Sequence, residues 1–376
     1  MPEQLEVHDS GDGSRDEELI DLDEGAEVLP YTFSITSYGA DYPVDGLVKR
    51  IREGDIVVPL FRMQPGEQDI SMVGFQREYV WKKLQADRFI ESLLLGLPVP
   101  GIFLVKEPNG KLLVLDGHQR LRTLEGFYDG VLGGSQFVLE SVQSRFQGKT
   151  YRTLEPEDRR RLDNSIIHAT IVRQDEPSQD QSSIYLVFER LNSGGTILQP
   201  QEIRVALYHG PLVKVLSELN DNADWRVLYG KRSTRLKDIE LILRFFALYF
   251  YGQQYTSPMK GFLNRYMAQN QDLSKQSAEM LRRIFTDCVS AIHTGIGARA
   301  FRPKNAVNAA VVDSVMCGVA SRQADRSLAD AASLKLPYDR LLGNPEFQAA
   351  TTRATANEET VRRRLALAKE AFNLAA

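Results

Sequence analysis

The stretch that decides the fold is IFLVKEPNGKLLVLDGHQRLRTLEGFYD, residues 102–129. It opens on an apolar run, passes through Pro-Asn-Gly at 108–110 and enters a second apolar run at 111–115. Two short apolar runs joined by such a turn predict a β-hairpin. The Asp-Gly pair at 116–117 then leads directly into a helical pattern, which places residues 118–120 in the first turn of a helix.

The segments before this stretch predict two helices and a strand. In the segment 44–53, the apolar residues fall at i, i+3, i+4 and i+7 and form one face of a short helix: Val44, Leu47, Val48 and Ile51. Gly54 suits the end of that helix, and 56–60 is a strand candidate. Residues 82–95 predict a second helix that ends at Gly96, with these residues on its inner side: Leu84, Phe89, Ile90, Leu93 and Leu94.

The segments after it predict one more strand and then mostly helices. Residues 165–173 form the strand candidate, in which His168 is expected to be a buried histidine with a satisfied ring. A helix follows from about Asp180 to Leu191, and Pro200 suits the first turn of another that runs through Leu207. From Arg235 onward the pattern is helical, with helices expected at 239–251 and near 274–293, 306–320 and 358–374. The fold class is therefore predicted to be α+β, with an all-α second half.

Length and charge suggest three regions. A chain of 376 residues with 43% hydrophobic residues is long enough for two cores. Residues 1–29 carry eleven carboxylates against Arg15 alone, which leaves +6 for the remaining residues of a chain with a net charge of −4. The tail is expected to be disordered, either as a solubilising extension or as a mimic of nucleic acid that covers a basic groove.

The remaining composition predicts a cytoplasmic protein without a membrane segment. No apolar run approaches the roughly 18 residues of a membrane span, and the start lacks the regions of a signal peptide. Cys288 and Cys317 have no metal-ligand spacing, so we expect them to be buried and reduced, and no metal site is predicted from the protein's own side chains.

The turn at 116–120 is the strongest candidate for chemistry. A helix that starts directly after a strand presents backbone N–H groups and a positive dipole end to an anion. Arg120 offers a planar fork to phosphate, with Arg122 close by, while Gln119 can orient a water and Asp116 can hold a metal, a sugar hydroxyl or Arg120 itself. An aspartate that only caps the helix and pairs with an arginine is the competing interpretation.

Two further clusters accompany that turn. In FQREYVW, residues 75–81, Arg77 lies between aromatic residues, although Tyr79 and Trp81 could be core residues beside a surface arginine. In FERLN, Asn192 ends a helix with Phe188 one turn before it on the same face, and Asn192 could equally be a helix cap.

Together the three clusters resemble the N-terminal domain of the GmrSD-type restriction endonucleases, a ParB/sulfiredoxin-like family. The matching stretches are GFQREYVWKKLQADRFIESLLLGLPVPGIFL, LLVLDGHQRLRTLEGFY and VFERLNSGGTILQPQEIRVALYHG. They follow the family pattern of an FQR-x-x-VW segment, a DGQQR box and an FxxxN motif. The resemblance is good over about residues 40–210.

The resemblance implies a ParB-like domain with a small mixed sheet at 30–210, followed by a helical domain at 211–376. It implies a nucleotide-binding and NTP-hydrolysing component of antiphage DNA restriction, with DNA, a nucleoside triphosphate and a separate nuclease subunit as partners and Mg²⁺ bound with the triphosphate. By position, the catalytic residues would be Asp116, His118, Gln119 and Arg120. The nucleotide-binding residues would be Arg77, Gly117, Arg122, Phe188 and Asn192.

The sequence departs from the family in two ways. His118 stands where the family usually has glutamine, and its charge is expected to titrate near neutral pH. Larger members carry a C-terminal HNH nuclease, but beyond residue 200 only His209 and His293 occur and they are not clustered, so no HNH nuclease is assigned. Two alternative functions stay open: a ParB-like phosphodiesterase that cuts DNA itself, and a non-enzymatic DNA-binding adaptor.

Overall fold

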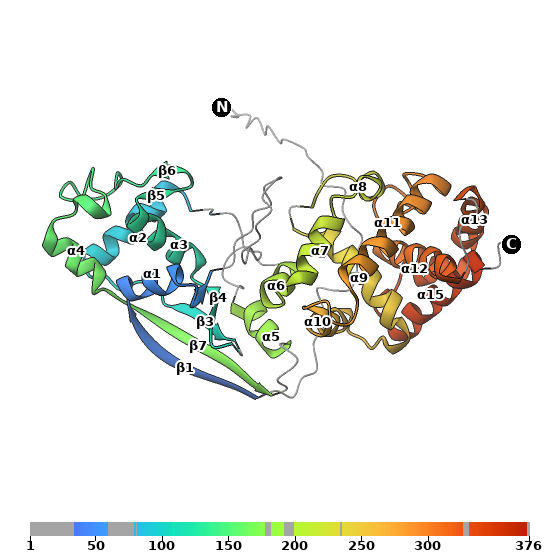
Figure 1. The fold of residues 1–376 in the computed structure, drawn as a ribbon, viewed down its shortest axis with the longest axis horizontal. Helices are drawn as coiled ribbons and strands as arrows, with labels where there is room; N and C mark the ends of the chain where they lie inside the picture. Colours follow the sequence, from blue (N-terminus) through green and yellow to red (C-terminus); the bar gives the residue numbers. More distant parts are fainter. Residues whose placement is uncertain are drawn as a thin grey trace, which may run out of the picture. The chain divides into compact units, whose positions relative to one another are not determined.

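The computed structural model describes residues 34–58, 79, 81–107, 109–176, 182–191, 199–233, 235–325 and 331–373. The acidic tail predicted at 1–29 lies outside these residues. The chain divides into two compact units. Of the described residues, 34–215 and 263–278 form the first, here called the sheet unit, and 216–262 and 279–373 form the second, the helical unit (Figure 1).

The sheet unit is built on a mixed sheet. Its five strands among the described residues are β1 (Ser34–Pro43), β2 (Ile56–Val57), β3 (Ile102–Lys106), β4 (Leu112–Asp116) and β7 (Ile166–Glu176). They lie in the order β1-β7-β3-β4-β2, in which β1/β7 and β3/β4 are antiparallel while β7/β3 and β4/β2 are parallel. The predicted small mixed sheet is confirmed.

The hairpin at the centre of the sheet forms as predicted. Leu104 pairs with Val114 and Lys106 with Leu112, and a register shift between Phe103 and Leu104 brings Phe103 opposite Asp116. The chain turns at 109–110, and Pro108 is outside the described residues. Both strands lie inside the sheet and are buried at most positions, which agrees with their continuous apolar runs.

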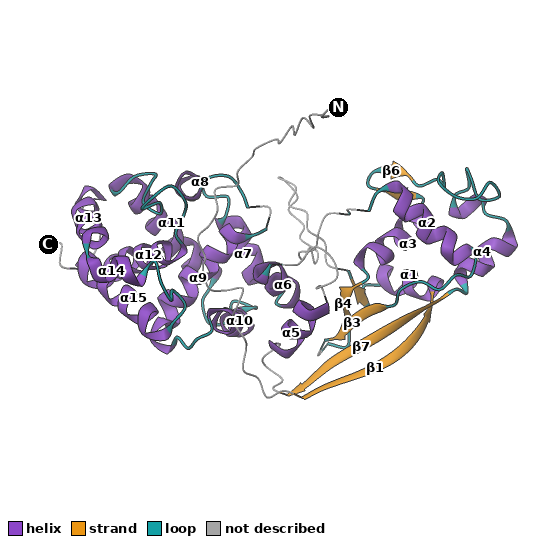
Figure 2. Ribbon diagram, turned by 180° about the vertical axis from the view of Figure 1, so that it is seen from behind, coloured by secondary structure: helices purple, strands orange, loops and turns teal. Residues whose placement is uncertain are grey.

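Four helices pack on the sheet and close the core: α1 (Val44–Arg52), α2 (Lys83–Leu94), α3 (His118–Asp129) and α4 (Pro156–Asp163). Figure 2 shows them gathered on one side of the strands. The predicted face of α1 is buried at all four of its apolar positions. The prediction for α2 holds except at Leu84, whose 43% exposure places it on the outer face.

The long paired strands β1 and β7 leave one histidine exposed to solvent. His168 was expected to be buried, but its side chain is 61% exposed, because it points to the uncovered face, where Nδ1 lies 2.9 Å from Asp41 Oδ1. The expectation that its ring is hydrogen-bonded is confirmed, whereas the expected burial is wrong. The alternation of the strand explains the difference, since Ile167 and Ala169 on either side are fully buried.

Short elements complete the sheet unit and connect it to the helical unit. A small hairpin consists of β5 (Val131–Leu132) and β6 (Ser135–Gln136). After β7 come α5 (Ser182–Leu191), close to the predicted bounds, and α6 (Pro200–Leu207), which begins at the predicted proline. The chain crosses into the helical unit within α7 (Pro211–Leu219).

The second half is helical, as predicted. Its helices are α8 (Ala223–Tyr229), α9 (Lys237–Tyr251), α10 (Met259–Asn270), α11 (Ala278–Gly295), α12 (Ala309–Asp325), α13 (Lys335–Gly343), α14 (Pro345–Ala350) and α15 (Glu358–Asn373). Cys288 and Cys317 are free thiols in the core, and burial raises the pKa of both. Over the described ranges, none of the helices combines the length and the apolar character that a membrane crossing requires.

A buried charge cluster joins three helices of this unit. Asp313 on α12 accepts from Arg244 on α9 at 2.9 Å and from Arg364 on α15 at 2.9 Å, and all three side chains are almost completely buried. Arg364 also donates to the carbonyl of Thr355. Burial and the nearby Arg244 lower the pKa of Arg364. Without Asp313, two guanidinium groups would lie in the core without their shared counter-ion.

We expect Asp313→Asn to lower the free energy of unfolding of the helical unit by about 3–5 kcal/mol, because it removes the charge that two buried arginines share. The matched control is Asp339→Asn, whose carboxylate pairs with Lys335 in water and contributes at most about 0.5 kcal/mol. Hydrogen exchange of α12 in a denaturant series measures the opening of this unit separately. Similar losses in the two variants would contradict the proposed role of Asp313.

Candidate functional site

The turn between β4 and α3 is closed by a left-handed glycine. Gly117 follows the last residue of β4, has φ +99° and occupies the N-cap position of α3 without a side-chain cap. A Cβ at this position would lie 2.4 Å from Cγ2 of Ile102 on β3. Glycine is therefore required both by the backbone conformation and by the close approach of β3. The first N–H groups of α3 receive no capping side chain from Gly117 and point out of the helix end, as the sequence predicts for an anion site.

Arg120 fastens this turn to the sheet. Its Nη2 donates to Asp116 Oδ2 at 2.6 Å and to the carbonyl of Gly101 at 3.0 Å. The guanidinium thus joins the first turn of α3 to the end of β4 and the start of β3. The competing interpretation is correct in that Asp116 forms an ion pair with Arg120. The side chain of Asp116 is nevertheless 46% exposed, and its Oδ1 has no hydrogen bond within the described part of the chain.

Arg122 is held in a similar way on the other side of the helix. It donates to the carbonyl of Val58 at 2.8 Å, just after β2, and it forms an ion pair with Glu125 one turn later. Its side chain is 18% exposed. Each of the two arginines also keeps a buried Nε without a hydrogen-bond partner among the described residues. The hydrogen bonds that both guanidinium groups do make hold the turn in position.

His118 is buried at the start of α3. It is 9% exposed, and neither Nδ1 nor Nε2 makes a hydrogen bond in the described part of the chain. Burial and then the positive charge of Arg122 lower the pKa of His118 to about 3. The expectation that His118 titrates near neutral pH is therefore wrong, because a charged ring would lose its hydration beside another cation. At neutral pH its ring has one donor and one acceptor, and neither is paired with a residue that the structure describes.

Gln119 connects the turn with the first sequence cluster. The backbone N–H of Trp81 donates to Gln119 Oε1 at 3.4 Å. Tyr79 Oη lies 2.8 Å from Thr123 Oγ1, and Thr123 in turn donates to the carbonyl of Gln119. Burial raises the pKa of Tyr79, so it remains a hydroxyl at neutral pH. Tyr79 and Trp81 also pack against the hydrophobic core, which favours their interpretation as core residues.

Thr123 was missed at the sequence level. It is completely buried in α3, one turn after Gln119. Its i, i+4 spacing from Gln119 could have indicated a shared helix face, but threonine in a helix carries no specific signal for a site.

The other predicted site residues are distributed as follows. Six of them lie together at the end of β4 and the start of α3: Asp116, Gly117, His118, Gln119, Arg120 and Arg122. Phe188 lies on α5 and is 1% exposed, which makes its ring part of the packed interior. Arg77 and Asn192 are outside the described residues.

The side chains at the turn could hold a metal ion only if a bound ligand supplied further coordinating atoms. No group of three or more histidine, cysteine or acidic side chains capable of holding a metal occurs within the described ranges. Asp116 offers one accessible carboxylate at the turn. Mg²⁺ is commonly bound by one or two carboxylates together with phosphate oxygens and water, so Asp116 fits an ion that arrives with a triphosphate.

We expect Gly117→Ala to destabilise the sheet unit by about 1–3 kcal/mol more than Gly110→Ala does, because only the former adds overpacking. Both glycines have positive φ, and Gly110 has open space where a Cβ would stand. The backbone cost of about 1–2 kcal/mol is thus common to both variants. Denaturant titration of each variant gives the difference, and equal losses would show that β3 yields to the added methyl group.

We expect His118→Gln to flatten the fall in stability toward acidic pH. Because the pKa of His118 is about 3 in the folded chain and 6.5 is its ordinary value, the unfolded chain binds more protons between these pH values. This contribution is fully present above pH ~6.5 and is lost by up to about 1.4 kcal/mol per unit as pH falls toward 3. Urea titrations of the ligand-free protein in EDTA measure it.

The control for this experiment is His168→Gln, which changes a histidine that lies mostly in water. This variant leaves His118 in place and should keep the fall in stability that His118 causes. If His118→Gln kept it as well, His118 could not be a buried neutral ring.

Comparison with known proteins identifies this part of the chain. A model of the GmrSD restriction endonuclease N-terminal domain matches residues 66–209, a range that contains all three sequence clusters. Neither the curated proteins nor the solved structures contain a significant match. The matched family is one of restriction-type DNA-defence proteins. Residues 66–209 of this chain are a GmrSD restriction endonuclease N-terminal domain.

Proposed function

We propose that the sheet unit binds a nucleoside triphosphate with Mg²⁺ at the start of α3 and hydrolyses it, as the nucleotide-dependent component of a DNA-restriction system whose DNA cleavage is carried out by a separate subunit. The observation that carries the proposal is the combination of an uncapped helix start with a buried His118 whose two ring nitrogens have no partner among the described residues. A bound ligand would relieve the cost of leaving these polar atoms unpaired.

Some groups of the turn would bind phosphate, and others keep the turn in its conformation. The backbone N–H groups of His118 and Gln119 and the dipole of α3 favour a phosphate group at the helix start. His118, neutral at pH 7, donates from one ring nitrogen to a phosphate oxygen or accepts from a water with the other. Arg120 is a positioning residue, because its guanidinium already binds Asp116 and Gly101.

Asp116 supplies the carboxylate that holds the metal-bound triphosphate. Its Oδ2 accepts from Arg120, and its Oδ1 would accept the ion, since the side chain is 46% exposed. Mg²⁺ shields the charge of the triphosphate during attack by water. Gln119 would orient that water, although its Oε1 also faces the backbone N–H of Trp81. Hydrolysis therefore requires a correctly oriented water in addition to the contacts that binding requires.

The proposal of a separate cleaving subunit is supported by the surroundings of the histidines beyond residue 200. His209 faces Glu107 within the sheet unit, at 3.6 Å from Nε2 to Oε1. His293 faces Asp224 within the helical unit, at 2.7 Å. Each forms a pair with one carboxylate of its own unit, whereas an HNH site needs clustered histidines around one metal.

We expect the purified chain to release phosphate from at least one NTP in the presence of Mg²⁺, and Asp116→Asn to lower the rate on the order of 100-fold because the charge that holds the metal is lost. The matched control is Asp129→Asn at the other end of α3, where the carboxylate pairs with Arg52 in water. Arg120→Ala should abolish release, and thermal melting of this variant separates loss of the turn from loss of chemistry.

The outcomes of this experiment are distinct. Release that persists in Asp116→Asn would place the site elsewhere, and no release with any NTP, with or without DNA, would end the proposal. His118→Gln should retain nucleotide binding, since glutamine also offers a donor and an acceptor. Nicking of a plasmid by the chain alone, lost in Arg120→Ala, would favour a phosphodiesterase instead.

A further inference from the structure

Two short segments of the helical unit carry a concentration of positive charge. Residues 226–237 contain five lysines and arginines and no carboxylate, and residues 299–304 contain three more and no carboxylate. The first segment joins the end of α8 to the start of α9, and the second lies between α11 and α12. Lysines and arginines in a helix-to-helix connection are often solvated residues without a role, so their arrangement in space decides what they can bind.

The two segments lie against each other because Arg302 joins them. Its guanidinium donates to the carbonyls of Leu228 and Tyr229 at the end of α8. Gly230 follows with φ +107°, and a Cβ there would lie 3.1 Å from Arg302 Nη2. The close approach of the arginine thus adds to the requirement for glycine at this position. Charges separated by about 70 residues in sequence form one surface.

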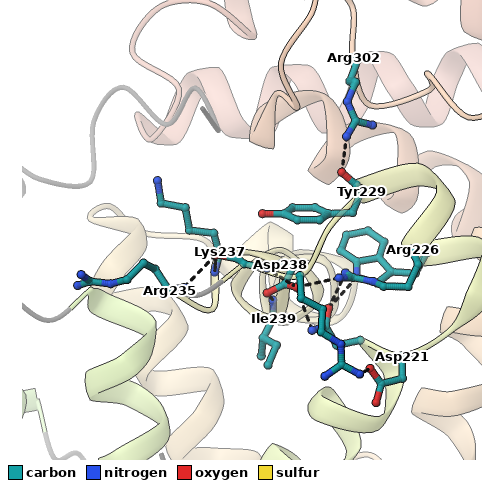
Figure 3. Close-up of polar contacts among 12 residues, drawn as sticks. Asp221, Arg226, Tyr229, Arg235, Lys237, Asp238, Ile239 and Arg302 are labelled. Carbon is teal, nitrogen blue, oxygen red and sulfur yellow. Dashed lines mark hydrogen bonds and ion pairs between the residues drawn. The ribbon is translucent and has the colours of Figure 1, made fainter. Parts of the chain in front are cut away.

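Both acidic side chains in the first turn of α9, Asp238 and Glu240, are buried. Asp238 is 1% exposed and accepts from Arg226 at 3.0 Å, from Asn220 at 3.0 Å and from the N–H of Ser233 at 3.1 Å. Figure 3 shows these contacts converging on Asp238, while the side chains of Arg235 and Lys237 extend away from it. The carboxylate therefore fixes the loop without cancelling the charge of its outer face.

The loop backbone is also held in place. Ser233 Oγ accepts from the N–H groups of Arg235 and Lys237, each at 3.2 Å. Arg299 donates to the carbonyl of Lys304 at 2.9 Å, which closes the second segment on itself. Cations on fixed loops lose less conformational entropy when they bind than cations on loops that must first be ordered.

Most of the outward cations have no carboxylate partner in the part of the chain that the structure describes. Arg232 pairs with Asp221, and Asp224 is occupied by His293. Four cations have no ion pair with any described residue: Lys231, Lys237, Arg299 and Lys304. We call them, with Arg232, the basic surface. Lys231, Arg232, Arg299 and Lys304 are exposed.

We propose that the basic surface of the helical unit binds the phosphate backbone of duplex DNA. Phosphate oxygens are the natural partners of clustered lysines and arginines that lack carboxylates, and such contacts position DNA without reading its sequence. The choice of DNA as the polyanion rests on the proposed function in DNA restriction. The binding surface itself belongs to a unit beyond the matched GmrSD domain at 66–209.

The test compares two charge reversals in the full chain. Lys231→Glu/Lys304→Glu changes the basic surface, and Arg340→Glu/Arg353→Glu changes the net charge equally at two exposed arginines of the same unit outside the surface. Binding of a short fluorescent DNA duplex is followed over a series of KCl concentrations. The first variant should bind about 60-fold more weakly at ~0.1 M salt, with a log–log salt slope shallower by about 1.8, because each lost phosphate contact removes about 0.9 from the slope.

The control variant should stay within about twofold of the unchanged chain if individual phosphate contacts rather than net charge carry the binding. Equal weakening in both variants, no DNA binding by the unchanged chain at low salt, or a preference for RNA of the same sequence would each overturn the proposal. Phosphate release without DNA is measured on all samples. Salt-sensitive binding through the basic surface without NTP hydrolysis would support this inference and end the proposed function, and the reverse pattern would do the opposite.

Discussion

The guanidinium of Arg120 is the contact on which the candidate site depends. It draws together the end of β4 at Asp116, the start of β3 at Gly101 and the first turn of α3, from which it projects. This closure is possible only because Gly117 adopts a left-handed conformation and lets Ile102 approach its Cα. The carboxylate and the carbonyl compensate the partly buried guanidinium for its lost hydration. An unpaired arginine at the same place would lose hydration without gaining hydrogen bonds, which would destabilise the fold. The main role of Arg120 in the DGHQR turn is therefore to hold the turn in its conformation.

Because Arg120 is held in this way, other groups would have to recognise the proposed phosphate ligand. The helix start provides N–H groups, and His118 provides a neutral ring whose nitrogens are unpaired among the described residues. The same positive charges that favour a phosphate also keep His118 unprotonated, because Arg122 opposes a second cation in a buried place. A glutamine at this position would be neutral in any environment. Histidine is compatible with the turn because burial makes it behave as a neutral donor and acceptor as well.

Local patterns in the sequence were sufficient for the elements that carry the site, and insufficient for what surrounds it. The β3–β4 hairpin and the start of α3 follow from apolar runs, a turn and an Asp-Gly pair that lie next to one another in the chain. The strand β1 was not predicted, because its ten residues, SITSYGADYP, have few apolar side chains, and it forms by pairing with β7 more than a hundred residues away. The pKa of His118 and the exposure of His168 depend on what covers each ring, which no local pattern contains. Asp313 was equally hidden, since its charge is balanced by arginines on two distant helices.

The two proposed anion sites differ in how much solvent they face, and this difference has a functional consequence. At the start of α3 the charged groups are mostly buried and paired, so added salt screens them weakly and recognition depends on fitted hydrogen bonds. On the basic surface Lys231 and Lys304 are exposed to water, where the attraction to a polyanion comes largely from the release of its counterions and falls steeply with salt. A fitted site suits a small ligand that must be held in one geometry for attack by water. An exposed surface whose attraction is screened by salt suits a long polyanion that binds and dissociates quickly. The two sites therefore differ in the way that the two proposed ligands, a nucleoside triphosphate and DNA, would require.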